Sequence, residues 1–303
     1  MLGNGCVLSP EMFAHLPSLK GRTLITTDGT TLLGADDKAG IAEIMTMAEQ
    51  VIREDLPHGK ICIAFTPDEE IGSGAADLDL EAFGADFGYT VDGGAENEVE
   101  YENFNAAAAS FEITGRSVHP GTAKGTMINA GLLAAQIAMM LPQAETPART
   151  EGREGFFHLT GIEGDVEHAK MTYIVRDHSA ARFAGRLETL RLVEKTLNEA
   201  YPAGTVKLSI REQYRNMIEK IEPEMHLIDT AKAAIRAQGM EPETPPVRGG
   251  TDGAQLSFRG LPCPNLGTGG YAFHGPYEHI TAEGMDAVVE ILKGIVQSYA
   301  GVK

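Results

Sequence analysis

The chain has 303 residues, of which 43% are hydrophobic, and this is enough apolar material for two domains rather than one. Its formal net charge of −18 argues against nucleic acid or an anionic membrane as a partner. No run of about 18 apolar residues predicts a transmembrane helix. The three cysteines lack the close spacing of a zinc–thiolate site, which predicts reduced thiols in a cytoplasmic protein.

The first hundred residues alternate helix-like and strand-like segments. Residues 38–54 place apolar side chains on one helical face,. Residues 61–66 (ICIAFT) predict a short buried strand, and residues 86–92 predict the end of a second strand,. Alternation of this kind predicts a mostly parallel sheet with helices on its faces. Both strands end in acidic residues, and sites in such sheets form at the carboxyl ends of the strands.

The middle of the chain, residues 104–216, has a different pattern and is predicted to be an inserted domain. Strand and helix alternate there in a way that suits a sheet covered by helices on one face, over residues 106–114, 127–141, 171–175, 183–200 and 205–210. The first pattern then resumes with helices over 225–238 and 281–298, the latter with Thr281 as its N-cap,. The sequence therefore predicts one α/β domain, 1–103 and 217–303, interrupted by an α/β insertion.

Acidic residues gather at three places in the larger domain. Residues 34–40 (GADDKAG) open a helix with an acidic pair, which an N-cap and a helix-dipole acid would also explain. Residues 67–72 (PDEEIG) hold three acids in a row. These raise one another's pKa unless a cation or hydrogen-bond donors compensate, although a solvated turn is the alternative. Asp92 ends an apolar strand, where an aspartate needs a specific partner.

One histidine, His274, lies in a glycine-rich stretch before the last helix. A lone histidine is weak evidence for a metal ligand, but carboxylates and imidazole together are the donors that a catalytic zinc takes. Two neighbouring metal ions need a bridging carboxylate, further ligands and a free acid that activates the shared water. Adjacent glutamates at a strand end diverge, so one can bind metal while the other accepts a proton. These roles can be filled by Asp36, Glu69, Glu70, Asp92 and His274.

The motifs GADDKAG, PDEE, YTVDGG and TGGYAFHG resemble the dizinc peptidase and deacylase family that includes carboxypeptidase G-type enzymes. The resemblance covers essentially the whole chain, and RGGTDGAQLSF with LPCPNL narrows it to the tripeptide aminopeptidases of that family. It implies a zinc-peptidase catalytic domain, 1–103 and 217–303, and a dimerisation (lid) domain, 104–216. It also implies that a cytoplasmic homodimer with two zinc ions per subunit uses zinc-activated water to release the N-terminal residue of tripeptides.

The resemblance implies a role for each residue of the acidic motifs. Asp36 corresponds to the carboxylate that bridges the two metal ions. Glu70 and His274 correspond to the other ligands of one zinc, and Asp92 corresponds to a ligand of the second zinc. Glu69 corresponds to the general base that takes a proton from the attacking water.

Three residues outside these motifs also correspond to functional positions. His119, in SVHPG, corresponds to a histidine that helps to hold the scissile carbonyl oxygen and reaches in from the partner subunit in related dimers. Arg176 and Arg248 correspond to anchors for the carboxylate of the peptide, which a guanidinium fork matches. For Arg176 the alternative is an ion pair within the chain, with Asp177 as one candidate.

The sequence departs from the family at one point. The family has an upstream His-x-Asp motif whose histidine binds the second zinc, whereas the only histidine before Asp36 in this sequence is His15, with no acid two positions later. We therefore expect that this sequence lacks the N-terminal part of the family's pattern, which carries the His-x-Asp motif. We also expect the protein to hold one zinc ion tightly. The alternatives are a relative that binds peptide or zinc without turnover, and dipeptidase or deacylase chemistry on the same scaffold.

Overall fold

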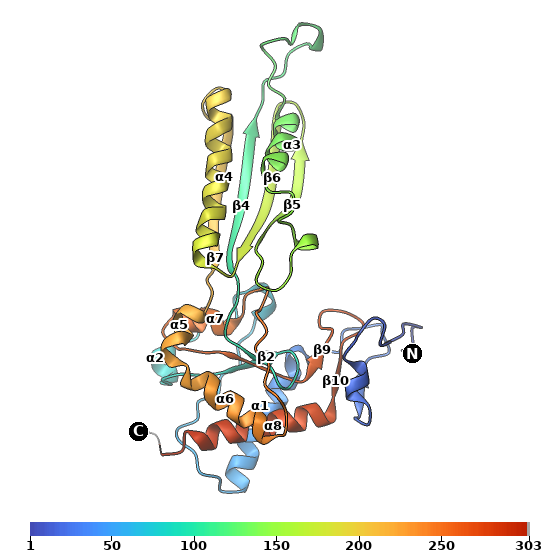
Figure 1. Cartoon of the computed structure of the whole chain (residues 1–303), viewed down its shortest axis with the longest axis vertical. Helices are drawn as coiled ribbons and strands as arrows, with labels where there is room; N and C mark the ends of the chain where they lie inside the picture. The colour runs from blue at the N-terminus through green and yellow to red at the C-terminus, as the bar shows by residue number, and fades with distance from the viewer. Residues whose placement is uncertain (302–303) are drawn as a thin grey trace. The chain divides into compact units, whose positions relative to one another are not determined.

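The computed structural model describes residues 1–301, which form two compact units (Figure 1). The first unit consists of Met1–Tyr101, Met217–Pro245 and the chain from Thr251 onward, and the second consists of Glu102–Asn216 and Pro246–Gly250. The predicted insertion, 104–216, lies within the second unit. That unit also takes in Pro246–Gly250, because Val247 pairs with Asn103 in a β-bridge. Among the described residues, every helix is too short or too polar to span a bilayer.

The first unit contains two small sheets and several helices, so the predicted α/β class is confirmed. One sheet has the order β1–β10–β9 and the other β2–β8–β3. Its strands are β1 (Leu24–Thr26), β2 (Thr90–Gly93), β3 (Val99–Glu100), β8 (Asn265–Gly267), β9 (Gly270–Tyr271) and β10 (His279–Thr281). Its helices are α1 (Ala35–Arg53), α2 (Leu80–Phe83), α5 (Ile218–Ile221), α6 (His226–Ala237), α7 (Asp252–Phe258) and α8 (Ala282–Ser298).

The core of the first unit forms where α1 and α6 pack against α8. Each helix has one apolar stripe, as in α8, where Val288, Ile291 and Ile295 are buried at helical spacing,. These stripes meet the buried side chains of β2 and β8 in one cluster. The predicted N-cap of the last helix is confirmed, because the Thr281 side chain accepts a hydrogen bond from the N–H of Gly284,.

Two predictions for this unit are wrong. Residues 61–66 do not form a strand, because they pair with no other described segment and Ile63 and Phe65 are exposed. An apolar run becomes a strand only when a neighbour satisfies its backbone groups. The sheets are also not mostly parallel, since β2 and β8 are the only pair of strands in the described part of the chain that run parallel. The segment that connects β9 to β10 is too short to contain the helical crossover that a parallel pair of strands requires,.

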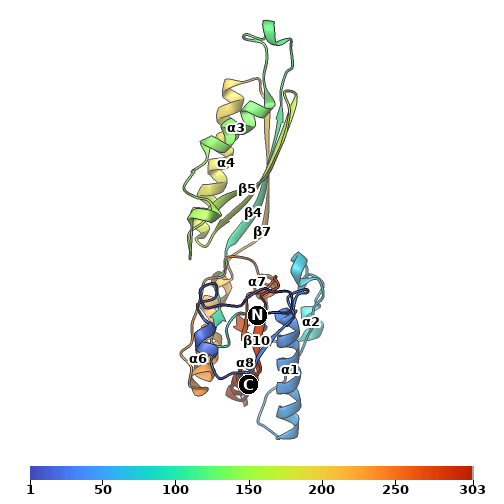
Figure 2. The ribbon, with the colours of Figure 1, turned by 90° about the vertical axis from the view of Figure 1, so that its right-hand side faces the viewer.

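The second unit is an antiparallel sheet of order β5–β6–β4–β7 with two long helices. In Figure 2 both helices lie on the same face of the sheet. The long elements are β4 (Asn105–Thr114), α3 (Ala130–Met140), β5 (Phe156–Gly164), β6 (His168–Asp177), α4 (Ala180–Ala200) and β7 (Val206–Tyr214). Short 3₁₀ turns are at Leu16–Leu19, Glu69–Ile71, Pro120–Thr122, Pro147–Arg149 and Glu222–Glu224.

Alternation in the strands explains why the helices cover one face only. In β4, Phe111 and Ile113 point into the core while the residues between and after them are exposed,. Helices α3 and α4 are capped by Asn129 and Ser179, whose side chains accept hydrogen bonds from the first turn,. Strand β5 was not predicted from the sequence. A shift in its pairing register between Leu159 and Gly161 interrupts the alternation by which a strand is recognised.

Candidate metal centre

Asp36 lies in an irregular turn where α1 begins. Gly34, before the helix, has φ 67°, a left-handed conformation that glycine adopts without strain,. Asp36 and Asp37 themselves have non-helical dihedral angles, and the regular helix follows them. A Cβ at Gly40 would lie 2.0 Å from the carbonyl oxygen of Val91. The glycine therefore lets α1 approach the backbone of β2, and this approach brings the acidic pair close to Asp92.

Glu69 and Glu70 lie on the 3₁₀ turn Glu69–Ile71. Asp68 before the turn and Gly72 after it are both left-handed, with φ 64° and 71°, so the chain reverses sharply around the two glutamates. The turn gives the two side chains different surroundings. Glu69 is half-buried and Glu70 is exposed.

His274 lies on the turn between β9 and β10, and its Nε2 atom faces two carboxylates. It is 2.8 Å from Oδ2 of Asp36 and 3.4 Å from Oε2 of Glu70. One ligand atom from each of these three residues lies within 4.8 Å of the other two. Three ligands of a tetrahedral zinc, each about 2.0–2.2 Å from the ion, lie about 3.3–3.5 Å apart. The three side chains can therefore close around such an ion with small shifts.

Asp92, on β2, belongs to the same cluster of acids. Burial raises its pKa to about 9, together with the charges of Asp37, Asp36 and Glu69 and a hydrogen bond with Asp36. Burial likewise raises the pKa of Asp37 to about 8, with contributions from Asp36 and Glu69. Carboxylates this close cannot all ionise without a compensating charge. A divalent cation supplies that charge, so the donor set fits a metal ion.

Glu69 is a partly buried acid rather than a fully solvated one. Burial raises its pKa, and the charges of Asp252, Glu70 and Asp36 raise it further, while His274 lowers it. A carboxyl whose pKa is shifted toward neutrality accepts and returns a proton more readily. Glu69 lines the same groove of about 600 Å³ as Asp36, Glu70 and Asp92.

Asp252 and Glu278, two acids of this region, were not singled out from the sequence. Asp252, in α7, accepts a hydrogen bond from the Thr66 hydroxyl at 3.1 Å, and its other oxygen is buried without a partner among the described residues. Glu278 accepts backbone hydrogen bonds from Gly34 and Asp36. The RGGTDG motif contains Asp252, but no local pattern marks Glu278.

His15, the only histidine before Asp36, is not part of the three-residue group. Its Nε2 lies 2.8 Å from Nε2 of His279, and its ring stacks on Tyr271 with centroids 4.1 Å apart. Burial and the neighbouring His279 both lower the pKa of His15. The contacts of His15 are therefore with the β9–β10 hairpin.

The remaining predicted residues belong to the second unit. His119 caps the 3₁₀ turn Pro120–Thr122, and its Nδ1 accepts a hydrogen bond from the N–H of Gly121 at 3.1 Å. An acceptor Nδ1 carries no proton, so the neutral ring holds its proton on Nε2. In this tautomer the exposed imidazole is a hydrogen-bond donor, as an oxyanion ligand must be.

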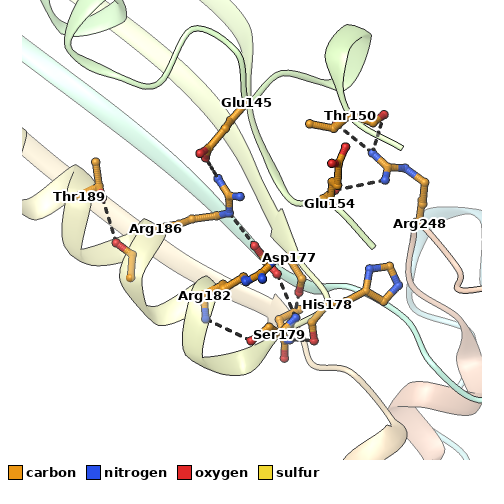
Figure 3. Close-up of polar contacts among 12 residues, drawn as sticks. Glu145, Thr150, Glu154, Asp177, His178, Ser179, Arg182, Arg186, Thr189 and Arg248 are labelled. Carbon is orange, nitrogen blue, oxygen red and sulfur yellow. Dashed lines mark hydrogen bonds and ion pairs between the residues drawn. The ribbon is translucent and has the colours of Figure 1, made fainter. Parts of the chain in front are cut away.

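The two arginines make hydrogen bonds within the second unit. Arg248 donates to the carbonyl oxygens of Thr150 and Glu154 (Figure 3) and to that of Gly152. Its guanidinium lies over the rings of Phe104 and Phe156. Arg176 donates to Val175, Ala107 and Gln213 and lies over the ring of Tyr214.

The alternative for Arg176, an ion pair with Asp177, is not what the structure shows. Asp177 pairs instead with Arg186, whose Nε lies 2.8 Å from its Oδ2 (Figure 3). The fork of Arg176 is held by uncharged oxygens, so its positive charge is not neutralised by that neighbour. This leaves the predicted role of an anion anchor open to Arg176.

The chain belongs to Peptidase family M20/M25/M40, whose model matches residues 27–298, and is therefore a peptidase. A peptidase T of Clostridium perfringens (strain 13 / Type A) is 55% identical over 300 residues, which are 99% of this chain and 74% of that protein. The structure is similar to aminopeptidase PepT from Bacillus cereus ATCC 10987, with TM-score 0.81 and 26% identity over 91% of this chain and 74% of the other.

Two further solved structures share the fold. A tripeptidase from Staphylococcus aureus subsp. aureus Mu50 has a TM-score of 0.81 and 25% identity over 93% of this chain and 75% of its own. The YXEP protein of Bacillus subtilis, described as a dinuclear metal-binding peptidase of the M20 family, has a TM-score of 0.65 and 15% identity over 88% and 72%. The family thus includes peptidases with a metal cofactor, and the donor set of the cluster fits such a group.

Proposed function

We propose that the protein is a zinc-dependent aminopeptidase that releases the N-terminal residue from tripeptides. The observation that carries the proposal is the meeting of Asp36, Glu70 and His274 within 4.8 Å, with the half-buried Glu69 beside them. Support for the substrate class comes from the peptidase T and tripeptidase relatives.

The metal-binding roles follow from the chemistry of the donors. Asp36, Glu70 and His274 would hold one zinc ion through two oxygens and one nitrogen, the mixed set that catalytic zinc sites use. Asp92, which shares a hydrogen bond with Asp36, would contribute to a neighbouring second position. When bound, zinc supplies a Lewis acid that polarises the scissile carbonyl and acidifies a water molecule.

Glu69 performs the proton transfers in this proposal. It accepts the proton that the attacking water loses and then gives it to the amine that leaves when the peptide bond breaks. Its elevated pKa suits both steps, because a strongly acidic carboxyl would not hold the proton between them.

The second unit supplies substrate contacts and the dimer in this proposal. His119 would donate its Nε2–H to the oxyanion in the site of the other subunit of a homodimer. Arg176 and Arg248 would anchor the peptide carboxylate, for which each must exchange one of its present hydrogen-bond partners,. We place the enzyme in the cytoplasm, in keeping with three cysteines that form no disulfide,.

A substrate panel with controlled metal content tests the proposal. The chelator-treated protein should be inactive and should regain activity on addition of zinc, and it should then cleave a tripeptide faster than the matching dipeptide or N-acyl amino acid. An N-acetylated tripeptide is the control and should not be cleaved, because an aminopeptidase needs the free amino terminus. Faster turnover of the dipeptide or the N-acyl amino acid would assign the scaffold to dipeptidase or deacylase chemistry instead.

A further inference from the structure

Glu278 shares a turn with the candidate ligand His274. The turn joins β9 to β10, and it is closed by the hydrogen bond from the N–H of Glu278 to the carbonyl of Gly275, at 3.2 Å. Although it is an acid, Glu278 is only 2% exposed. A buried carboxylate is costly unless hydrogen bonds satisfy it, so its partners indicate why it is there.

Both oxygens of Glu278 bind the backbone of the segment that carries Asp36. Oε2 accepts from the N–H of Gly34 at 2.7 Å, and Oε1 accepts from the N–H of Asp36 at 3.1 Å. These donors precede the regular part of α1 and have no partner within the helix,. One carboxylate thus fixes the irregular turn at two points, one of them the peptide N–H of Asp36 itself.

The hairpin that carries Glu278 is held from its other side. Tyr271 of β9 and His279 of β10 are paired in register, and the ring of His15 stacks on both, with centroids 4.1 Å and 5.0 Å away. Nδ1 of His279 is 2.7 Å from the carbonyl of Tyr277. Because these contacts hold both strands, the turn between them can keep His274 and Glu278 in fixed positions.

We propose that Glu278 is a positioning residue that sets Asp36 relative to His274, so that the two ligands are pre-arranged for the metal ion. The inference rests on the proposed function for the identity of the ligands. It goes further because it assigns the relative position of two segments, the start of α1 and the β9–β10 turn, to one side chain that binds neither metal nor substrate. Outer partners that orient ligands in this way are worth about 10–100-fold in metal affinity.

Glu278→Gln is the test variant, since it keeps the size of the side chain. An amide offers one acceptor oxygen and an NH₂ group, so either the N–H of Gly34 or that of Asp36 would face a donor. Zinc affinity is measured by competition with a chromophoric chelator, well below the melting temperature of the metal-free protein. We expect about 10-fold weaker zinc binding or more, and a changed visible spectrum when cobalt replaces zinc, because the ligand geometry is no longer fixed.

The matched control is Asp177→Asn in the second unit. Asp177 is also a buried carboxylate, and it accepts from the backbone N–H of Ser179 just before α4 and from Arg186 (Figure 3). Its replacement should lower the melting temperature without changing zinc affinity. If Glu278→Gln does not fold, Glu278→Asp keeps the charge on a shorter side chain and should also weaken zinc binding.

The outcomes separate this inference from the proposed function. Zinc binding that is lost in His274→Ala but unchanged in Glu278→Gln would overturn the positioning role and leave the metal centre intact. A lower melting temperature of Glu278→Gln with unchanged zinc affinity and cobalt spectrum would also overturn it, because the role would then be structural only. Zinc binding that does not depend on His274 at all would contradict the proposed function itself.

Discussion

The Nε2 atom of His274 lies 2.8 Å from Oδ2 of Asp36, although 238 positions of sequence separate the two residues. The contact joins the start of α1 to the β9–β10 turn, and Glu70 reaches the same imidazole from a third segment. The imidazole of His274 therefore lies between two acidic side chains. Burial lowers its pKa, but the hydrogen bond to Asp36 and the charge of Glu70 outweigh burial and raise it. Carboxylate oxygens and an imidazole nitrogen are the donor types that a catalytic zinc takes.

Replacement of Glu69 by glutamine should abolish most turnover while it preserves metal binding. Glutamine has nearly the same shape but cannot accept the proton of the attacking water, and general acid–base catalysis contributes about 10²–10⁴-fold. We expect kcat for a tripeptide to fall by about that factor, with zinc content unchanged by elemental analysis. Asp68→Asn is the neighbouring control. Asn tolerates the left-handed conformation of that position,, and the variant should stay active. Near-normal kcat in Glu69→Gln would assign the base elsewhere.

Activity should depend on subunit exchange if His119 acts across a dimer. Glu69→Gln and His119→Ala subunits should each be nearly inactive, and a mixture of the two should recover activity because some mixed dimers hold one intact site. Recovery of up to about a quarter of wild-type activity is the expectation for random pairing, in the two-fold symmetric dimer that is commonest among oligomers. Exchange is checked with a tagged subunit. Exchange without any recovery would show that His119 acts in its own chain or not in catalysis.

Arg176 should distinguish a free peptide carboxylate from an amide. A guanidinium binds a carboxylate through two parallel hydrogen bonds, whereas lysine offers a single point charge. Arg176→Lys should therefore reduce the ratio of kcat/KM for a tripeptide to that for its C-terminal amide by about 10-fold or more, the usual value of a hydrogen bond to a charged group. Arg182→Lys, on the exposed face of α4, is the control and should keep the ratio. An unchanged ratio in Arg176→Lys would remove Arg176 from the carboxylate site.

The buried Glu43 should make stability depend on pH. Both of its oxygens lack partners among the described residues, and burial, with the charge of Asp37, raises its pKa to about 9. The unfolded carboxyl titrates near about 4.3, so folding takes up a proton between these pH values. The stabilisation that this proton carries is complete below about pH 4.3 and declines as pH rises toward 9.

Glu43→Gln removes this titration, because the amide is neutral at every pH. The melting temperatures of the metal-free variant and the metal-free wild type are compared at about pH 5 and about pH 8.5. The variant should gain relative to wild type at the higher pH, by about 2–4 °C for each kcal/mol of unfolding free energy that the wild type loses. Glu49→Gln, on the exposed side of α1, should show no such difference. A relative melting temperature for Glu43→Gln that is equal at both pH values would mean that Glu43 is ionised in the folded protein.

Much of the fold could be predicted from local patterns. The last helix and its Thr281 cap followed from spacing and capping chemistry, and the helix predicted over 183–200 lies within α4. Pairing is not local, and this is why residues 61–66 were wrongly predicted as a strand and why β5, with its register shift, was missed. A strand depends on its neighbour for its hydrogen bonds, and the sequence does not name that neighbour.

The candidate site also has residues that local sequence patterns could identify and one that they could not. Asp36, Glu69, Glu70 and Asp92 stood out because they belong to acidic pairs or runs, or end an apolar segment, and because their motifs resemble those of the family. Their catalytic and metal-binding roles stay predictions. Glu278 is one acid in an ordinary turn. It becomes notable only through two hydrogen bonds to residues more than 240 positions away.

Diffraction data collected at the zinc absorption edge test the central claim most directly. Crystals of the protein loaded with zinc should give an anomalous peak about 2.0–2.2 Å from a carboxylate oxygen of Asp36, a carboxylate oxygen of Glu70 and Nε2 of His274. The same crystals of His274→Ala should lose that peak or hold it weakly. Zinc bound elsewhere, for example between His15 and His279, with no peak at the three predicted ligands, would contradict the account.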